Sequence, residues 1–515
     1  MTPYVAATFA FEAKLKNLTE AALSRQRFLL LSGGAIGTGL AGCSGGGVIN
    51  VAPSGSAQKP VNGTSPSPTP TAAPNAASSS ASITITRSQT TGVLPPMLAG
   101  LSYEKSKISA NTFNAGNTGL IACFTRLGAS ILRIGGNSVD QTTWTPNGPG
   151  GTNGQVAPSD ISALAAFAQA TGWRIIYGIN LATNTPSSAA AEAAYAASAF
   201  GSSLFNFEIG NECDQYAMKG LRPSAYDVSD FITEWSSYAS AIRQAVPNAP
   251  LSGPASAANT GTWTVPFASS ESSQINLLTQ HYYCGNGQSA SSTMSELLAP
   301  SSYLLSMLTT LQSAAGSLGI SNGYRLAEAN SYYNGGAPGV SDAFGSALWA
   351  IDFLMLNAQY GSAGVNFHGG GDGPGYTPIA DKNGAPVDLR PVYYAMLFVA
   401  QIAQGRMYAV NVNAEVSMTA YAVAGNDGAT YLVIINKDPS NAAFATIALG
   451  AAASGANSLV LSGAGLSATT GTLLSGATVA ANGVWLPNIE PGISASGSTL
   501  ALDVAAASAV LLRII

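Results

Sequence analysis

Short apolar runs alternate with longer stretches of helical period between about residues 97 and 404. We predict strands at 98–103, 131–134, 174–179, 204–209, 251–253, 275–283, 324–327 and 364–367. Helical patterns lie between or after them at 160–170, 226–245, 303–317, 343–357 and 391–403. Eight strands, each followed by a helix or a long loop, favour a (β/α)8 barrel of class α/β. A doubly wound sheet would alternate in the same way, but no Gly-x-Gly-x-x-Gly motif follows the first strand.

The helical period disappears after about residue 405. Short β-type segments separated by Gly, Asn and Ser take its place, at 429–435, 458–461 and 507–514. This pattern is typical of an antiparallel β-sandwich, which we place at 405–515. The segment 82–96 alternates in the same style, and we expect it to add an N-terminal strand to that sandwich. The barrel would then occupy 97–404.

Residues 1–43 have the pattern of an export signal. Arg25 and Arg27 precede an apolar run at 28–31, and small residues lead from there to the stretch Leu40-Ala41-Gly42-Cys43. This stretch resembles the lipobox of bacterial lipoproteins, in which the cysteine is lipidated. A plain cleaved signal with an incidental cysteine is the alternative.

Residues 44–81 consist mostly of Gly, Ser, Pro, Thr and Ala. Such a segment cannot bury a core, and we expect a disordered tether. Behind a lipidated Cys43, the tether would hold the globular part away from a membrane. We therefore expect an exported protein of the bacterial cell envelope, lipid-anchored in the periplasm or at the surface, or a secreted one.

Charged residues make up only 9% of the chain, and the net charge is −5. A surface of this kind depends on uncharged polar groups and suits partners that are uncharged or carbohydrate. The 20 Lys+Arg form no basic cluster, which argues against a nucleic-acid partner.

Besides Cys43 the chain has Cys123, Cys213 and Cys284, so at least one thiol is unpaired. A disulfide between Cys213 and Cys284 stays open. The chain has only two His and no Cys-x-x-Cys, so a structural zinc site is not expected. We predict that the protein needs no metal and no organic cofactor.

Two glutamates each follow an apolar strand, Glu212 the fourth and Glu328 the seventh. Barrel enzymes carry their catalytic groups at the C-terminal ends of the strands, so these two carboxylates can face each other. A pair about 5–5.5 Å apart supports glycoside hydrolysis with retention. Glu328 would be the nucleophile and Glu212 the acid/base, kept protonated by the neighbouring charge. A solvated loop carboxylate is the alternative for each.

Gly210-Asn211-Glu212 with a later strand-end Glu resembles clan A of the glycoside hydrolases. More narrowly, the chain resembles glycoside hydrolase family 79, the β-glucuronidase and heparanase family, in the bacterial exo-acting form. Three further segments carry this resemblance, 132–137 (Leu-Arg-Ile-Gly-Gly-Asn), 280–283 (Gln-His-Tyr-Tyr) and 328–336 (Glu-Ala-Asn-Ser-Tyr-Tyr-Asn-Gly-Gly). The resemblance covers about residues 83–515.

The resemblance implies roles for matching residues. Asn211 would bind the sugar 2-hydroxyl, and Arg133 would keep Glu328 ionised. Tyr283 would donate its hydroxyl to Glu328, with Tyr282 as a rival for that role. His281 is expected to support the barrel interior more than to catalyse. The sugar carboxylate would be bound by Tyr333, Gly335, Gly336 and Tyr376.

These observations predict a retaining β-glucuronidase that removes terminal β-linked glucuronic acid from an oligosaccharide or polysaccharide. Scarce basic residues favour exo-acting over endo-acting, heparanase-like cleavage. Another clan A glycosidase (a β-galactosidase, xylosidase or arabinofuranosidase) is the enzymatic alternative. A surface carbohydrate-binding lipoprotein is the non-enzymatic one. Cys213 stands where related enzymes often carry Pro, and the oligomeric state stays open.

Overall fold

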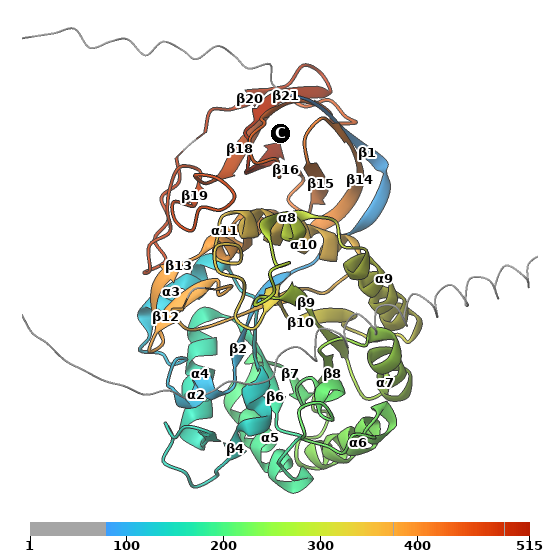
Figure 1. Cartoon of the computed structure of the whole chain (residues 1–515), viewed down its shortest axis with the longest axis vertical. Coiled ribbons are helices and arrows are strands. Elements are labelled where there is room, and N and C mark those ends of the chain that lie inside the picture. The colour runs from blue at the N-terminus through green and yellow to red at the C-terminus, as the bar shows by residue number, and fades with distance from the viewer. Residues whose placement is uncertain (1–78, 374, 489) are drawn as a thin grey trace, which may run out of the picture. The chain divides into compact units, whose positions relative to one another are not determined.

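Eight parallel strands close into a barrel in the computed structural model, which describes residues 79–373, 375–488 and 490–515 (Figure 1). In chain order the strands are β2 (Ala99–Glu104), β3 (Ile131–Gly135), β6 (Arg174–Ile179), β7 (Leu204–Ile209), β8 (Leu251–Ser256), β9 (Leu277–Asn286), β10 (Tyr324–Tyr333) and β11 (Val365–Gly369). Neighbours round the barrel follow the same order, and β11 pairs with β2 to close it. The predicted (β/α)8 barrel is confirmed.

Helices surround the barrel and connect its strands (Figure 1). They are α2 (Ser106–Ser109), α3 (Thr118–Leu127), α4 (Pro158–Thr171), α5 (Pro186–Phe200), α6 (Val228–Ala245), α7 (Val265–Glu271), α8 (Met294–Leu298), α9 (Ser302–Ser317), α10 (Gly345–Gln359) and α11 (Pro391–Val399). Local chemistry determines where several begin. Asp227, for example, accepts hydrogen bonds from the backbone N–H groups of Ser229 and Asp230 at the start of α6.

The barrel strands are buried on both faces, because side chains fill the interior and helices cover the outside. Every residue of β3 and of β8 is buried. This explains why the strands are nearly continuous apolar runs in the sequence.

A second sheet of ten strands contains both ends of the described chain, with β1 (blue) beside β14 in Figure 1. Its strands are β1 (Ser79–Leu94), β14 (Gly405–Ala414), β15 (Met418–Gly425), β16 (Thr430–Asn436), β17 (Ala443–Ala448), β18 (Gly455–Ser462), β19 (Leu473–Leu474), β20 (Ile493–Ser494), β21 (Thr499–Val504) and β22 (Ser508–Ile514). Strand β1 runs antiparallel to β14 and parallel to β17. The predicted β-sandwich with an added N-terminal strand is confirmed, and that strand begins at Ser79.

Two short ribbons complete the described strands. They are β4 (Thr143–Trp144) with β5 (Gln155–Val156), and β12 (Ile379–Lys382) with β13 (Ala385–Leu389).

Helix α10 links the barrel to the sheet through one carboxylate. Asp352 accepts hydrogen bonds from the hydroxyls of Thr419 (2.8 Å) and Tyr421 (2.7 Å) on β15. Lys437 Nζ lies 2.9 Å from its other oxygen. These contacts join the barrel domain to the ten-stranded sheet through α10, most of which is buried.

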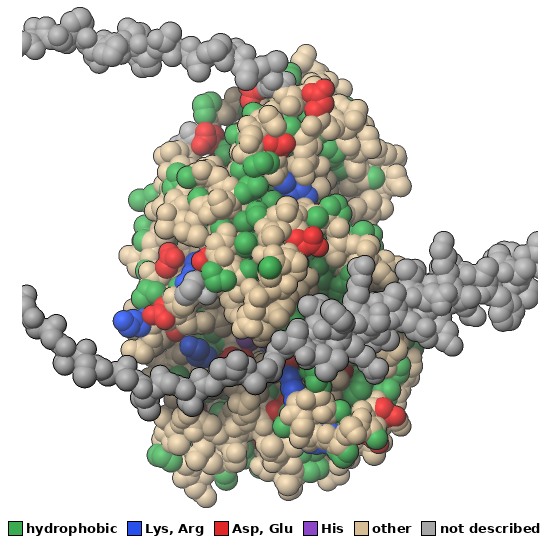
Figure 2. Space-filling model, viewed as in Figure 1, with side chains coloured by type: hydrophobic (Ala, Val, Ile, Leu, Met, Phe, Trp, Pro, Cys, Tyr) green, Lys and Arg blue, Asp and Glu red, His purple; other side chains and the backbone are tan. Residues whose placement is uncertain are grey.

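Charged side chains are scattered on the face drawn in Figure 2, where tan and green atoms predominate. Within the part of the chain that the structure describes, no helix is long and apolar enough to cross a membrane. The predicted export signal at 1–43, with Cys43, and nearly all of the tether at 44–81 lie outside the described residues.

Candidate active site

Polar side chains from several strands meet inside the barrel near the C-terminal ends of the strands. Alternate residues of a strand point to the same face, so the inward positions recur with a period of two. The inward polar residues are Ser102 on β2, Arg133 on β3, Glu208 on β7, His281 and Tyr283 on β9, Glu328 on β10 and His368 on β11.

Arg133 is the centre of this network, and its guanidinium is fully buried. Its Nε donates to Glu208 (2.5 Å), Nη1 to Glu328 (2.8 Å) and Nη2 to Asn211 (2.9 Å). Burial by itself would lower the pKa of Arg133, but the two carboxylates raise it, so the guanidinium stays charged. Gly135 leaves room for this group, because a Cβ there would lie 2.2 Å from the guanidinium.

Glu328 lies within β10 and not at the strand end that we predicted, because the strand continues beyond it. The register of β10 against β9 shifts between Leu326 and Glu328, and such a bulge redirects a side chain. Tyr283 donates its hydroxyl to Oε1 at 2.8 Å, while Arg133 binds Oε2. Burial by itself would raise the pKa of Glu328, but the charges of His368 and Arg133 help to lower it. The carboxylate is therefore held in its ionised form.

Glu212 lies beyond the end of β7 in a left-handed backbone conformation, with φ 51° and ψ 49°. Such strained conformations of non-glycine residues cluster at functional sites. His281 Nδ1 lies 3.2 Å from Oε1 and Lys219 Nζ lies 2.9 Å from Oε2. Arg133 Nη2 lies 3.2 Å from His281 Nε2. A guanidinium can only donate, so Nε2 accepts and Nδ1 carries the proton that His281 donates to Glu212.

The prediction that Glu212 stays protonated is wrong for the free protein. Burial raises the pKa of Glu212, but the hydrogen bond from His281 and the Lys219 ammonium outweigh burial and lower it. The prediction from the sequence takes into account only the charge of Glu328, and not those of the groups that contact Glu212. The opposing positive charge is that of Lys219, which lies in an irregular loop. The sequence of this loop has neither a strand nor a helix period, so the position of Lys219 could not be predicted.

One carboxylate oxygen of Glu212 and one of Glu328 lie within 4.8 Å of each other. A nitrogen of His281 lies within the same distance of both, so the three residues offer donors of the types that divalent cations accept. The same groups already bind Arg133 and Lys219. A metal ion would have to displace two cations, so this donor set fits a metal poorly.

Three tyrosines lie together where the sugar carboxylate was expected. The ring of Tyr283 lies 6.3 Å from that of Tyr333 and 6.0 Å from that of Tyr376. The backbone N–H of Tyr376 donates to the carbonyl of Gly335 at 3.2 Å. A Cβ on Gly336 would lie 2.9 Å from Tyr376 N, so only glycine allows this close approach. The end of β10 and the loops after β10 and β11 thus bring the predicted carboxylate-binding residues together.

Tyr282 does not belong to the site. Its ring points away from the barrel interior and stacks on Tyr303 and Phe353, at 6.3 and 5.3 Å. Adjacent residues of a strand face opposite sides, so Tyr283 and Tyr282 cannot both reach Glu328. The suggestion that Tyr282 could replace Tyr283 is therefore wrong.

The cysteines of the described chain, Cys123, Cys213 and Cys284, are all free thiols, and no disulfide joins Cys213 to Cys284. Cys213 is buried directly after Glu212. Burial raises the pKa of the Cys213 thiol well above its ordinary value, which makes it unreactive.

Lys219, Glu208 and His368 contact the site but were not predicted from the sequence. His368 Nδ1 lies 3.0 Å from Ser102 Oγ and 3.7 Å from Glu328 Oε2. The period of two along β7 and β11 could have indicated Glu208 and His368 as inward residues. Nothing in the sequence could have indicated Lys219, which lies in an irregular loop.

Glu104, at the end of β2, also adjoins the network. Its carboxylate accepts from Ser138 N (2.8 Å), and His368 Nε2 lies 3.7 Å from its other oxygen. Burial would raise the pKa of Glu104, but His368 and Ser138 lower it to about 2. The imidazole of His368 thus stands between two carboxylates, Glu104 and Glu328.

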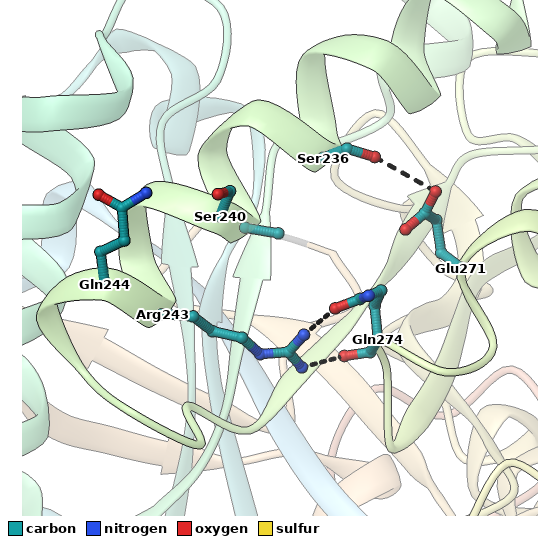
Figure 3. A pocket seen from close by; sticks show the side chains of 7 residues that line it. Ser236, Ser240, Arg243, Gln244, Glu271 and Gln274 are labelled. Atoms are coloured by element: carbon teal, nitrogen blue, oxygen red, sulfur yellow. Dashed lines mark hydrogen bonds between the residues drawn. The ribbon is translucent and has the colours of Figure 1, made fainter.

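A cavity of about 440 Å³ lies on the outside of the barrel, between α6 and α7 (Figure 3). Ser236 donates to Glu271 at 3.2 Å across it, and Arg243 bonds to Gln274. Gln274 precedes β9, so this end of the cavity lies at the opposite end of the strands from Glu212. Its polar side chains bind one another, and we assign it no ligand.

No family model matches the chain. It is 26% identical to a β-glucuronidase of Aspergillus niger over 354 residues, which cover 59% of this chain and 63% of that protein. It is 25% identical to a β-glucuronidase of Neurospora crassa over 315 residues, covering 52% and 55%. The chain thus matches less than two thirds of the length of each curated relative.

Solved structures share the fold. A 4-O-α-L-rhamnosyl-β-D-glucuronidase of Fusarium oxysporum superposes with a TM-score of 0.71 and 18% identity, covering 84% of this chain and 100% of that one. A GH51 arabinofuranosidase of Xanthomonas axonopodis gives 0.62 and 16%, covering 85% and 100%. This chain is therefore similar to β-glucuronidases in sequence and to glycoside hydrolases in fold.

Proposed function

We propose that the protein is a retaining β-glucuronidase that removes terminal β-linked glucuronic acid from glycans by double displacement. The observation that carries the proposal is the close pair of carboxylates, Glu212 and Glu328. Glu328 is held ionised by Arg133 and Tyr283, and an oxygen of Glu212 lies within 4.8 Å of it. Retaining enzymes have carboxyl groups about 5–5.5 Å apart, whereas inverting enzymes need about 6.5–9.5 Å for a water molecule.

Glu212 is ionised in the free protein, so it must first take up a proton from solvent when substrate binds. In the first step, a Glu328 oxygen would then attack the anomeric carbon while Glu212 gives this proton to the departing glycosidic oxygen. The sugar is then covalently bound to Glu328, whose charge has gone. In the second step Glu212 would take a proton from water, and the resulting hydroxide would displace Glu328. Arg133 and Tyr283 would stabilise the carboxylate that departs.

Recognition of the sugar would come from uncharged donors. Asn211 Oδ1 accepts from Arg133, which leaves Nδ2 to donate to the 2-hydroxyl. Tyr333, Tyr376 and the Gly335–Gly336 backbone would bind the carboxylate. Hydrogen bonds to an ionised group are stronger than neutral ones, so these donors can select a uronate without a cation.

Glu212→Gln and Glu328→Gln, assayed on an aryl β-glucuronide, test the catalytic pair. Glu328→Gln should lose about 10³-fold or more in kcat, because it removes the nucleophile. Glu212→Gln should lose about 10²–10⁴-fold for a poor leaving group. Glu415→Gln, at an exposed glutamate in the loop between β14 and β15, is the matched control and should retain wild-type activity. Near-normal turnover by either site variant would refute the proposal.

The anomer formed first distinguishes a retaining from an inverting enzyme. Proton NMR of the hydrolysis of a β-glucuronide should show β-glucuronic acid before mutarotation. Initial release of the α-anomer would contradict double displacement.

Tyr333→Phe tests the choice of sugar. We expect kcat/KM for an aryl glucuronide to fall about tenfold or more, since a hydrogen bond to a charged group is lost, while that for the matching glucoside hardly changes. The exposed Tyr303→Phe on α9 serves as the control. Equal activity of the wild type on glucuronide, glucoside, galactoside, xyloside and arabinofuranoside would favour another glycosidase, and glycan binding without hydrolysis would favour a binding protein.

We further propose, from the sequence alone, that the enzyme is exported and anchored by a lipid on Cys43. Cys43→Ser should then move the protein from the membrane fraction to the soluble fraction and abolish labelling with a radioactive fatty acid. Unchanged fractionation and labelling would contradict the anchor.

A further inference from the structure

Lys219 is the one cation in direct contact with Glu212 among the described residues. Its ammonium lies 2.9 Å from Glu212 Oε2 and 2.7 Å from Asn137 Oδ1. These contacts use two of its three N–H groups. The side chain of Lys219 is 30% exposed, so the third N–H is open to a ligand.

The loop that carries Lys219 is anchored at its two ends and exposed at its tip. Tyr216 donates its hydroxyl to Asp140 at 2.6 Å, and Arg222 donates to the carbonyl of Ala182 at 3.0 Å. Between these anchors, Met218 is 66% exposed. Lys219 can therefore change its partner without disturbing the fold.

We propose that Lys219 is a specificity-determining residue that binds an anionic group, a carboxylate or a sulfate, on the leaving part of the substrate. The inference rests on the proposed function, in which Glu212 protonates the leaving oxygen. A general acid lies about 2.6–3.2 Å from the oxygen it protonates. The Lys219 ammonium is therefore within about 6–8 Å of the leaving oxygen, and a charged substituent on the first leaving unit can reach it.

Binding of such an anionic group would also favour the protonated form of Glu212, which is the form that can act as a general acid. In the free protein the ammonium stabilises the ionised carboxylate, which cannot donate a proton. An anionic leaving group would draw the ammonium away and bring a negative charge near, and both effects favour the protonated acid. Charged or titratable groups also face this pair from other segments, namely His281, Glu328, Asp214, Tyr283 and Tyr376 at Glu212, and Asp140 at Lys219.

Three aryl β-glucuronides test the inference on the full chain, with 3-carboxyphenyl, 3-sulfophenyl or the uncharged 3-carbamoylphenyl leaving groups. Wild type should prefer the charged leaving groups about fivefold in kcat/KM, the size of a partly exposed ion pair. Lys219→Met should lose this preference and Lys219→Arg should keep part of it. Lys382→Met, at another exposed lysine, should keep all of it. The same preference in Lys219→Met as in wild type would overturn the inference.

The carboxylate and sulfonate arms separate the two anions. A preference for only one identifies the group that Lys219 accepts, because the two differ in shape and in hydrogen-bond geometry. No preference by wild type for either would overturn the inference.

The pH profile gives a second readout that a merely structural lysine would not move. With the neutral leaving group, kcat/KM falls as pH rises through the pKa of Glu212, because the acid form is lost. Lys219→Met removes the cation that favours the ionised form, so this limb should move to higher pH. An unmoved limb would count against the inference.

Failure of the inference can be told apart from failure of the proposed function. Hydrolysis that needs Glu212 but ignores Lys219 would overturn the inference alone. A wild type that hydrolyses no glucuronide would overturn both.

Discussion

Arg133 joins two carboxylates and an amide that the chain places far apart in sequence. Its partners Glu208, Asn211 and Glu328 come from β7, from the loop after it and from β10. An arginine suits this role because its planar fork donates in several fixed directions at once. The same residue therefore contributes both to the shape of the site and to its charge balance.

Arg133→Met should destabilise the protein by roughly 3–5 kcal/mol, because it leaves buried carboxylates without a counter-charge. Urea unfolding measures this loss in the free energy of unfolding. The double variant Arg133→Met/Glu208→Gln should recover part of it, since one of the unpaired charges has gone. A double variant that is less stable than the single one would contradict this account.

His368 should set the acid limit of activity. Glu328 must be ionised to attack, so kcat/KM falls as pH drops through its pKa, which lies below the ordinary 4.5. Burial by itself would lower the pKa of His368, but Glu328 and Glu104 raise it, so the ring carries a charge. His368→Gln removes that charge, raises the pKa of Glu328 and should shift the acid limb to higher pH.

The carboxyl group of the substrate also titrates at acid pH, but its titration is the same whether the wild type or His368→Gln is assayed. The difference between wild type and His368→Gln on one substrate therefore belongs to the protein. An acid limb that stays in place would show that Arg133 and Tyr283 keep Glu328 ionised without His368.

At the scale of elements, the barrel strands could be predicted because burial on both faces leaves a continuous apolar run. Predicted ends were less reliable. Strand β10 continues to Tyr333, since its last residues pair with β9 although they include polar side chains. The bulge before Glu328 has no sequence signal, because it arises from the fit between neighbouring strands.

The candidate site was also predictable only in part: residues on regular strands could be predicted, but residues in irregular loops could not. The end of an apolar strand indicated Glu328, and the resemblance of the segments in β3 and β9 to glycoside hydrolases implied Arg133 and Tyr283. The resemblance to glycoside hydrolases agrees with the relatives found, whereas the narrower family stays a prediction. The surroundings of Glu212 were not predictable, because Lys219 reaches it from an irregular loop.

Position 135 of β3 should not tolerate a side chain, because the guanidinium of Arg133 occupies that space. Gly135→Ala would place a Cβ 2.2 Å from the guanidinium and push Arg133 away from Glu328. Misplacement by about 1 Å can lower activity about 10²-fold, and we expect a loss of this size in kcat on an aryl glucuronide. Gly316→Ala in α9, where a Cβ meets nothing within 4 Å, is the control and should stay active. Equal activity of the two variants would contradict the packing argument.

At the scale of the whole molecule, the second domain depends on a strand that precedes the barrel. Strand β1 pairs with β14 on one side and β17 on the other, and Ile83 and Ile85 of β1 are buried in the sheet core. The barrel is thus inserted between two parts of one sheet, and the domains are not separable by a single cut.

Two shortened chains test this dependence. A chain that begins at Pro74 keeps the compact unit of residues 74–515 and should unfold cooperatively, as followed by circular dichroism. A chain that begins at Pro95 lacks β1 and exposes two strand edges, so it should aggregate on gel filtration. A soluble, active chain from Pro95 would show that the sheet closes without β1.

The pairing of β1 with β14 also joins two strands that are synthesised at very different times. From Leu94 to Gly405 the ribosome must add 311 residues before β1 meets its antiparallel partner. At about 5–20 residues per second, this takes roughly 15–60 s. During that interval β1 lacks its antiparallel partner, and its exposed alternate positions, largely Ser and Thr, keep one face of the strand polar. The sheet therefore cannot be completed before the sequence of the barrel has been synthesised.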